Sequence, residues 1–341
     1  MIGAGAVGSA VATLLADQGR DVLLAGPALA TDASRVAAGM IAPLSEAALD
    51  PASRDAASVL SAGALAWPAF AERFGIPLRA CGGLLLSPSP QVGAVQPGEQ
   101  VSLDFAQSLA PFLQRWDGSI RWLPDERAVD AEAALRRLEA QFTRRGGRRI
   151  DATLHPAADG TWQYAGGRIV ARQTVIAMGQ GSETLAGVAA ELAVLTPIRG
   201  QILRTVPGVV PPGAPFVRGP GAYVAPQADG AVMIGATMEA DIRSLTPSHE
   251  TSQALMAAAA TFAPGLETAG MTARVGLRAS TPDALPLVGP SRRAGLLLAT
   301  GLRRNGWLLA PLVAGLIADY LAGKDPGPLA RRLDPQRFER L

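Results

Sequence analysis

The 341-residue sequence has one cysteine, one lysine and two histidines, and each scarcity excludes a class of chemistry. Cys81 alone cannot form an internal disulfide, a C-x-x-C redox pair, a thiolate zinc site or an iron–sulfur cluster. Lys324, in the polar segment GKDPG, is poorly placed to form a Schiff base, which argues against pyridoxal phosphate chemistry. His155 and His249 lie far apart in polar surroundings, so we expect no metal site.

Charge and hydropathy narrow the class of protein further. The net charge is only +2, and no run rich in lysine or arginine is interleaved with aromatics, so we expect no nucleic-acid partner. The longest apolar stretch, 306–318, is shorter than the roughly 20 residues that a membrane span needs, and it contains Pro311. The N-terminus lacks the basic region of a signal peptide. These absences predict a cytoplasmic protein without a membrane span.

The chain opens with MIGAGAVGSA, in which Gly3, Gly5 and Gly8 form a G-x-G-x-x-G motif. This motif is typical of the turn that brings backbone N–H groups to a dinucleotide pyrophosphate at a helix N-terminus. A helical pattern at 9–20 and a buried-strand pattern at 21–26 follow at the spacing of a βαβ unit. The alternative is a glycine-rich start without structural meaning.

The βαβ interpretation requires a strand before the motif, yet only Met1 and Ile2 precede Gly3. The strand would be central in a doubly wound sheet and buried on both faces. We therefore expect the motif to be genuine and its first strand to be truncated by a start placed too late. An in-frame apolar run of about five residues upstream would support this hypothesis.

The remaining patterns predict an α/β protein. Helices are expected at 56–74, 126–147 and 305–323, and buried strands at 173–179 and 295–301, with strand-like segments between 196 and 236. We therefore predict a Rossmann-like dinucleotide-binding domain interleaved with an antiparallel-sheet α+β substrate domain. The first comprises 1–75, 124–195 and 272–341, and the second comprises 76–123 and 196–271.

Eight segments, in order along nearly the whole chain, resemble the D-amino-acid-oxidase-like (DAO) family of FAD-dependent oxidoreductases. The resemblance is closest to its glycine oxidase branch, which serves thiamine (thiazole) biosynthesis. The segments are GAGAVGSA (3–10), VAAGMIAPLSEA (36–47), LAWPAF (65–70), VIAMG (175–179), TPIRGQI (196–202), AYVAPQADGAVMIGATME (222–239), GLRASTPDALPLVGP (276–290) and ATGLRRNGWLLAPLVAGLIADYL (299–321).

The resemblance implies noncovalent FAD held at several places along its length. The motif would hold the pyrophosphate, 38–41 would pass the flavin ring, and the helix N-terminus at 305–308 would face the pyrimidine end of the isoalloxazine. The implied cofactor residues are Gly3, Gly5, Ala6, Val7, Gly8, Ala38, Gly39, Met40, Ile41, Ile150, Gly179, Gly301, Leu302, Arg303, Arg304, Asn305, Gly306, Trp307 and Leu308.

The resemblance also assigns a substrate site. Arg278 matches the arginine that pairs with the substrate carboxylate, for which a guanidinium fork is well suited. Tyr223 matches a tyrosine whose hydroxyl contacts that carboxylate, and Arg304 matches a further residue at the substrate. Met238 stands where sarcosine-oxidase relatives carry an oxygen-activating lysine, although it could equally be ordinary core.

The implied reaction is oxidation of a small amino acid, glycine first, to an imine that hydrolyses to glyoxylate and ammonia. Hydride passes from the substrate Cα to flavin N5, and O2 is reduced to hydrogen peroxide. Two alternatives stay open: a D-amino-acid or opine dehydrogenase that passes electrons to a carrier, and a non-catalytic remnant that binds no flavin. The sequence leaves the oligomeric state open, a homo-oligomer included.

One departure from the family bears on the cofactor. Relatives carry an acid at the end of the second strand to hydrogen-bond the adenosine ribose, and here that position is Gly26. The register of Asp32 does not identify it as a substitute. The sequence therefore predicts weaker flavin binding or a compensating contact.

Overall fold

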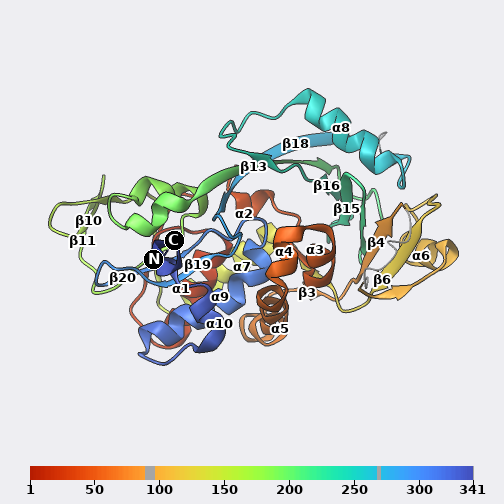
Figure 1. Cartoon of the computed structure of the whole chain (residues 1–341). Helices are drawn as coiled ribbons and strands as arrows, with labels where there is room; N and C mark the ends of the chain where they lie inside the picture. Colours follow the sequence, from red (N-terminus) through yellow and green to blue (C-terminus); the bar gives the residue numbers. More distant parts are fainter. Residues whose placement is uncertain (89–96, 267–269, 341) are drawn as a thin grey trace.

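The computed structural model describes residues 1–88, 97–266 and 270–340 and has the predicted α/β architecture. One domain, here called the dinucleotide domain, is built on a mostly parallel sheet, and the other, the substrate domain, on a large mixed sheet (Figure 1). Within the described residues, each helix is too short or too polar to cross a bilayer.

The sheet of the dinucleotide domain is joined at its centre by Ile2. This residue makes parallel bridges to Ala25 and Ile176, and its amide donates to the Val175 carbonyl oxygen at 2.9 Å. Ile2 thus lies where the strand before the glycine turn belongs in a doubly wound sheet. The strands are, in spatial order, β8 (Arg148–Ile150), β1 (Leu23–Ala25), Ile2, β12 (Thr174–Ile176), β20 (Leu296–Thr300) and the antiparallel β19 (Leu287–Pro290).

Helices cover this sheet because their sequences are apolar on the faces they bury. α1 (Ala6–Asp17) and α9 (Gly306–Leu321) are built mainly from small and aliphatic residues, and they share one core with α5 (Ala57–Phe74) and α7 (Ala131–Arg144). The helices predicted after the glycine turn and at 305–323 are therefore confirmed as α1 and α9. The loop residues before each helix are not part of this core.

The helix predicted at 126–147 was too long. Residues Arg127–Val129 form β7, and the helix begins only after Asp130, whose side chain accepts a hydrogen bond from the Ala133 amide at 2.7 Å. An N-cap aspartate of this kind satisfies a free amide of the first turn, so it fixes where the helix begins.

The substrate domain contains the nine-stranded sheet. α8 (His249–Ala260) covers the face of this sheet that points away from the dinucleotide domain (Figure 1). The strands are β17 (Glu239–Ala240), β13 (Thr196–Thr205), β16 (Val232–Gly235), β15 (Ala222–Pro226), β14 (Phe216–Gly219), β4 (Gly83–Ser87), β6 (Ser119–Leu123) and β5 (Glu99–Gln100), with β18 (Met271–Ser280) paired to β13.

β18 bears on the predicted domain division. It pairs antiparallel with β13 over its full length, from Thr196 opposite Ser280 to Thr205 opposite Met271. The predicted boundary at 272 therefore falls inside a strand of the large sheet. We propose to assign 272–280 to the substrate domain and keep the rest of the predicted division.

Smaller elements complete the chain. The segments that carry site residues are α2 (Ala33–Val36), β2 (Met40–Ile41), α3 (Pro43–Leu49) and η1 (Gly179–Leu185). The others are α4 (Pro51–Asp55), β3 (Leu78–Arg79), α6 (Leu103–Leu109), β9 (His155–Pro156), β10 (Trp162–Tyr164), β11 (Gly167–Ile169), η2 (Ala190–Val194), α10 (Gly327–Arg332) and η4 (Pro335–Arg340).

Candidate active site

Two cavities meet where the domains join. The first, of about 350 Å³, lies between the substrate sheet and α2, α3 and the start of α9. The second, of about 480 Å³, runs past the glycine turn, the ends of β1, β12 and β20, and β18. Ala33 and Arg278 line both cavities, so the two spaces adjoin at these residues.

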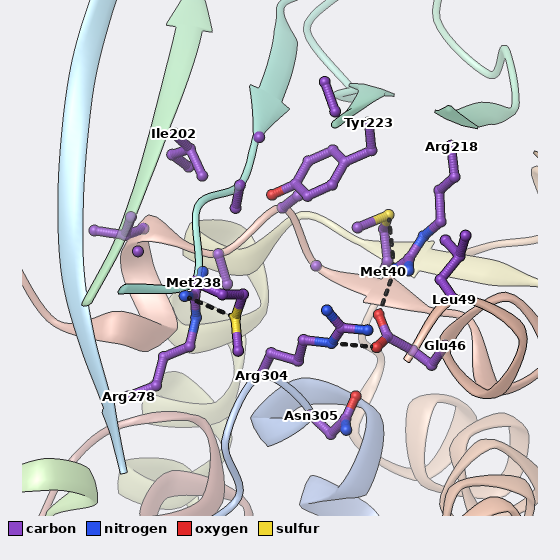
Figure 2. A pocket seen from close by; sticks show the side chains of 18 of the residues that line it. Met40, Glu46, Leu49, Ile202, Arg218, Tyr223, Met238, Arg278, Arg304 and Asn305 are labelled. Atoms are coloured by element: carbon purple, nitrogen blue, oxygen red, sulfur yellow. Dashed lines mark hydrogen bonds and ion pairs between the residues drawn. The ribbon is translucent and has the colours of Figure 1, made fainter. Parts of the chain in front are cut away.

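The first cavity brings together the four residues predicted for the substrate (Figure 2). Arg278 comes from β18 and Tyr223 from β15, whereas Met238 follows β16 and Arg304 precedes α9. These residues lie far apart in sequence, so their convergence on one cavity agrees with the role that the resemblance gives them.

Arg278 is the cation of this cavity without an acidic partner among the described residues. Its Nη1 donates to the Thr237 carbonyl oxygen at 3.0 Å and lies 3.5 Å from Met238 Sδ. Burial, together with the nearby charges of Arg304 and Arg303, lowers the pKa of the Arg278 guanidinium. A partly buried guanidinium with other cations nearby would be stabilised by a bound anion, so the surroundings of Arg278 are suited to a carboxylate.

Burial also acts on Tyr223. It raises the pKa of the Tyr223 phenol above its ordinary value of 10.0, with Arg278 and Arg218 opposing the shift. The hydroxyl therefore stays protonated near neutral pH and can donate a hydrogen bond to a ligand oxygen.

An ionic cluster that was not predicted from the sequence lies in the wall of the same cavity. Glu46 of α3 forms ion pairs with Arg218 of β14 and, at 2.5 Å from its Oε2 to Nε, with Arg304. Asp50, at the end of α3, pairs with Arg303 and lies 3.6 Å from Arg304 Nη2. Burial alone would raise the pKa of the Glu46 carboxyl, but Arg218 and Arg304 hold it below its ordinary value.

Only part of this cluster left a signal in the sequence. Glu46 lies inside the 36–47 segment that carries the family resemblance. It is therefore close in sequence to residues 38–41, which the resemblance places beside the flavin ring. Arg218 stands in no recognisable motif and is one of many arginines. Its pairing with Glu46, 172 residues away in sequence, is visible only in the fold.

The second cavity is built around the glycine turn. Gly3 has a φ of +107°, and a Cβ there would lie 2.3 Å from the Ala177 carbonyl oxygen. A Cβ on Gly8 would lie 1.9 Å from the Gly3 carbonyl oxygen. These two glycines hold the turn tightly against β12 and α1, which leaves the backbone of the turn as the cavity wall.

The residues of the second cavity fit an elongated dinucleotide. The lining begins at Gly26 and Ala152, beside the ends of β1 and β8, continues along the glycine turn, and reaches Arg278 beside the first cavity. Gln180, which also lines it, has both side-chain amide atoms buried without a hydrogen-bond partner among the described residues. Buried polar groups require a partner, and the polar atoms of a dinucleotide would supply one.

The start of α9 lies between the two cavities. Trp307 Nε1 donates to the Ser34 carbonyl oxygen at 2.9 Å, and its own carbonyl oxygen accepts from Trp67 Nε1 at 3.0 Å, which fixes the first turn of the helix. Asn305 makes no side-chain cap, so free amides and the positive end of the helix dipole face the cavities. This end of the helix would stabilise negative charge on a bound flavin.

Fourteen of the nineteen predicted cofactor residues line a cavity. Gly3, Gly5, Ala6, Val7, Gly179, Leu302, Arg303 and Gly306 line the second, and Ala38, Gly39, Met40, Arg304, Asn305 and Trp307 line the first. Five line neither: Gly8, Ile41, Ile150, Gly301 and Leu308. Ile41 and Leu308 are buried in the core of the dinucleotide domain. The Ile150 carbonyl oxygen accepts a hydrogen bond from the Gly26 amide, and Gly26 lines the second cavity. These three residues therefore pack behind residues that line a cavity.

Gly26 and Asp32 line the second cavity together. The Asp32 carboxylate accepts a hydrogen bond from the Leu29 amide at 2.9 Å, and burial raises its pKa. The family position for a ribose-binding acid holds Gly26 in this chain, but the carboxyl group of Asp32 reaches the same cavity. The sequence alone did not reveal this placement of Asp32.

Other reactive side chains lie elsewhere. Cys81 is half-buried between β3 and β4 and lines neither cavity, and Lys324 is exposed in the turn after α9. In the part of the chain that the structure describes, no group of three or more His, Cys, Asp or Glu residues could hold a metal ion.

Comparisons with known proteins agree with this geometry. A family model described as "FAD dependent oxidoreductase" (DAO) matches residues 1–320. The chain is 34% identical over 230 residues to the bifunctional protein ThiO/ThiG of Trichormus variabilis, covering 64% of this chain and 34% of that protein. It is 34% identical over 165 residues to the glycine oxidase of Pseudomonas aeruginosa, covering 47% and 44%. The matches thus span less than half of these relatives' own lengths.

Solved structures share the fold. An iminodiacetate oxidase from Chelativorans sp. BNC1 superposes with a TM-score of 0.84 at 23% identity, covering 98% of each chain. A glycine oxidase from Geobacillus kaustophilus also gives 0.84 at 23% identity, covering 98% of this chain and 97% of that one. At such identities the likeness concerns the fold alone.

Proposed function

The chain belongs to the DAO family of FAD-dependent oxidoreductases, and we propose that it oxidises a small amino acid, glycine first, with O2 as the acceptor. The observation that carries this proposal is the position of Arg278. It lines both cavities and has no acidic partner among the described residues, so a carboxylate bound to it would lie beside the cofactor.

The chain's own residues bind and orient the substrate. Arg278 would take the carboxylate through its guanidinium, and the protonated Tyr223 hydroxyl would donate to one carboxylate oxygen. Met238, whose Sδ contacts the Arg278 guanidinium, supports that orientation and keeps the wall apolar. Arg304, held by Glu46, would complete the polar side of the cavity.

Bound FAD supplies the hydride acceptor for the substrate C–H bond, and no protein acid or base is required to take that hydrogen. Oxidation of glycine gives the imine, which water converts to glyoxylate and ammonia, while O2 takes up the two electrons and two protons released by the amine and becomes hydrogen peroxide. We propose that the flavin is noncovalent, since Cys81 lines neither cavity. The sequence relatives named glycine oxidase support the choice of glycine, and a place in thiamine biosynthesis belongs to the same proposal.

The test is the visible absorbance of the purified protein before and after anaerobic addition of glycine. We expect two flavin bands that bleach with glycine, and peroxide with glyoxylate when air is admitted. Flavin bands that do not bleach with glycine but do with a D-amino acid or an opine, without peroxide in air, would favour a dehydrogenase. Protein that binds no added FAD would favour a flavin-free remnant.

A further inference from the structure

Glu46 places a carboxylate of the protein itself in the wall of the substrate cavity. Its side chain is buried, with 6% of the residue exposed, and two guanidinium groups converge on it from different parts of the chain. Arg218 reaches it from β14, and Arg304 Nε lies 2.5 Å from its Oε2. In Figure 2 Arg304 lies between Glu46 on one side and Arg278 on the other.

Two converging guanidiniums are the arrangement that recognises a carboxylate ligand. The cavity therefore holds two positions suited to a carboxylate, one at Arg278 and one between Arg304 and Arg218. Arg278 has no acidic partner among the described residues, whereas the second position is filled by Glu46. The fold thus leaves one carboxylate position for a ligand.

We propose that Glu46 determines substrate specificity by filling the second carboxylate position, so that the cavity accepts amino acids with one carboxylate and rejects dicarboxylic ones. This inference rests on the proposed function. A second substrate carboxylate near Arg304 would meet the Glu46 carboxylate, and like charges in a buried site repel strongly. Displacing Glu46 would break its buried pair with Arg218, which is costly because it leaves a buried charge without a partner.

A purely structural role for the cluster makes a different prediction. Glu46 and Arg218 also tie α3 to the substrate sheet, and loss of such a tie would lower stability without changing which ligand the cavity prefers. The decisive readout is therefore a ratio of affinities and not activity or melting temperature.

The experiment measures dissociation constants of acetate and malonate, which contain no oxidisable amine, from the change in flavin absorbance of the FAD-loaded protein. We expect the wild type to bind acetate more tightly than malonate. Glu46→Gln should shift the ratio of affinities toward malonate by about tenfold or more, because the repelling charge is gone and the carboxylate that Arg218 and Arg304 share is removed. Glu191→Gln is the matched control: Glu191 is a buried acid that accepts hydrogen bonds from the Ser291 hydroxyl and the Arg292 amide, and it lines neither cavity.

A double variant keeps the test valid if Glu46→Gln does not fold. Glu46→Gln with Arg218→Met removes both members of the most buried pair and leaves Arg304 as the only second cation, so a smaller shift toward malonate is expected. An unchanged ratio in either folded variant overturns the proposal, as does a wild type that prefers malonate. Because neither ligand is oxidised, these outcomes are independent of whether glycine is the substrate, which the bleaching experiment decides separately.

Discussion

The guanidinium of Arg278 lies directly over Gly200, on the neighbouring strand β13. A Cβ added to Gly200 would lie 2.0 Å from Arg278 Nη1 and 2.2 Å from Cζ, whereas the backbone there needs no left-handed conformation. The absence of a side chain at Gly200 thus leaves the space that the Arg278 guanidinium occupies. The three atoms nearest to such a Cβ belong to the far end of a flexible side chain, so we expect a substitution to displace the guanidinium and leave the strands paired.

We therefore predict that Gly200→Ala raises the KM for glycine by about tenfold or more, because misplacing a binding group by roughly 1 Å weakens its contacts severely. The melting temperature should change little. Steady-state kinetics and thermal unfolding measure both. Gly187→Ala is the control, since a Cβ there meets no atom within 4 Å. A KM equal to that of the control would show that the position of the Arg278 guanidinium does not depend on the space left by Gly200.

The fold could be predicted because its glycine turn and apolar helices depend on local patterns, whereas the candidate site residues were inferred from the family resemblance and share one cavity. The glycine turn, the apolar helix after it and the segment around Arg278 each carry their signal within a few residues. The ion pairs of Glu46 could not be predicted, because they join side chains brought together by the packing of α3, β14 and the start of α9. The start of α7 was misjudged for a related reason: the strand β7 owes its conformation to pairing with β2 and β3, and not to its own sequence pattern.

The glycine turn supplies the second prediction, which concerns cofactor binding. Gly8→Ala would place a Cβ 1.9 Å from the Gly3 carbonyl oxygen, and backbone cannot move aside as a side chain can. We expect the turn to be pushed away from the cavity, with loss of bound FAD and about 1–3 kcal/mol of stability. The flavin-to-protein absorbance ratio and thermal unfolding measure this.

Gly315→Ala is the matched control for that change. Gly315 lies inside α9, and a Cβ there meets nothing within 4 Å. Alanine in a helix interior stabilises relative to glycine by about 0.5–1 kcal/mol, so this variant should retain FAD and unfold at a slightly higher temperature. Full FAD retention by Gly8→Ala would contradict the close packing of the turn.

The third prediction concerns stability in acid. Arg218 and Arg304 outweigh the effect of burial and hold the pKa of Glu46 below its ordinary value of 4.5. The ion pairs therefore contribute stability that is present above pH 4.5 and is lost as the pH falls through the folded-state pKa. At neutral pH we expect Glu46→Gln to lower the free energy of unfolding by about 3 kcal/mol, because it leaves the buried Arg218 without its ion-pair partner.

The difference between wild type and Glu46→Gln should then narrow as the pH falls, since the wild type alone loses the contribution of Glu46. Carboxyl groups that do not interact with Glu46 or its arginine partners titrate alike in both proteins and cancel in the comparison. Urea unfolding of both proteins from neutral to acidic pH provides the measurement. A difference that stays constant across this range would mean that the pKa of Glu46 is the same in the folded and the unfolded protein.

The last prediction concerns retention of the cofactor at the exposed side of the second cavity. Arg243 and Leu245 line this cavity from the loop after β17, and Arg243 forms an ion pair with Glu183 of η1. Arg199 of β13 holds the loop in place, because its Nε and Nη2 donate hydrogen bonds to the Ser244 and Thr246 carbonyl oxygens at 2.9 and 2.7 Å. The ion pair thus holds the loop of one domain against the other, beside the cavity that would hold the dinucleotide.

Arg243→Ala should increase the rate of FAD release by about twofold to fivefold, an effect of the size expected for an exposed ion pair, and high salt should accelerate release from the wild type but not from the variant. Recovery of flavin fluorescence after dilution measures the rate. Arg204→Ala removes a comparable surface pair, with Asp229, away from either cavity and should leave the release rate unchanged. Equal release rates for the two variants would show that the loop covers the cavity without the help of this ion pair.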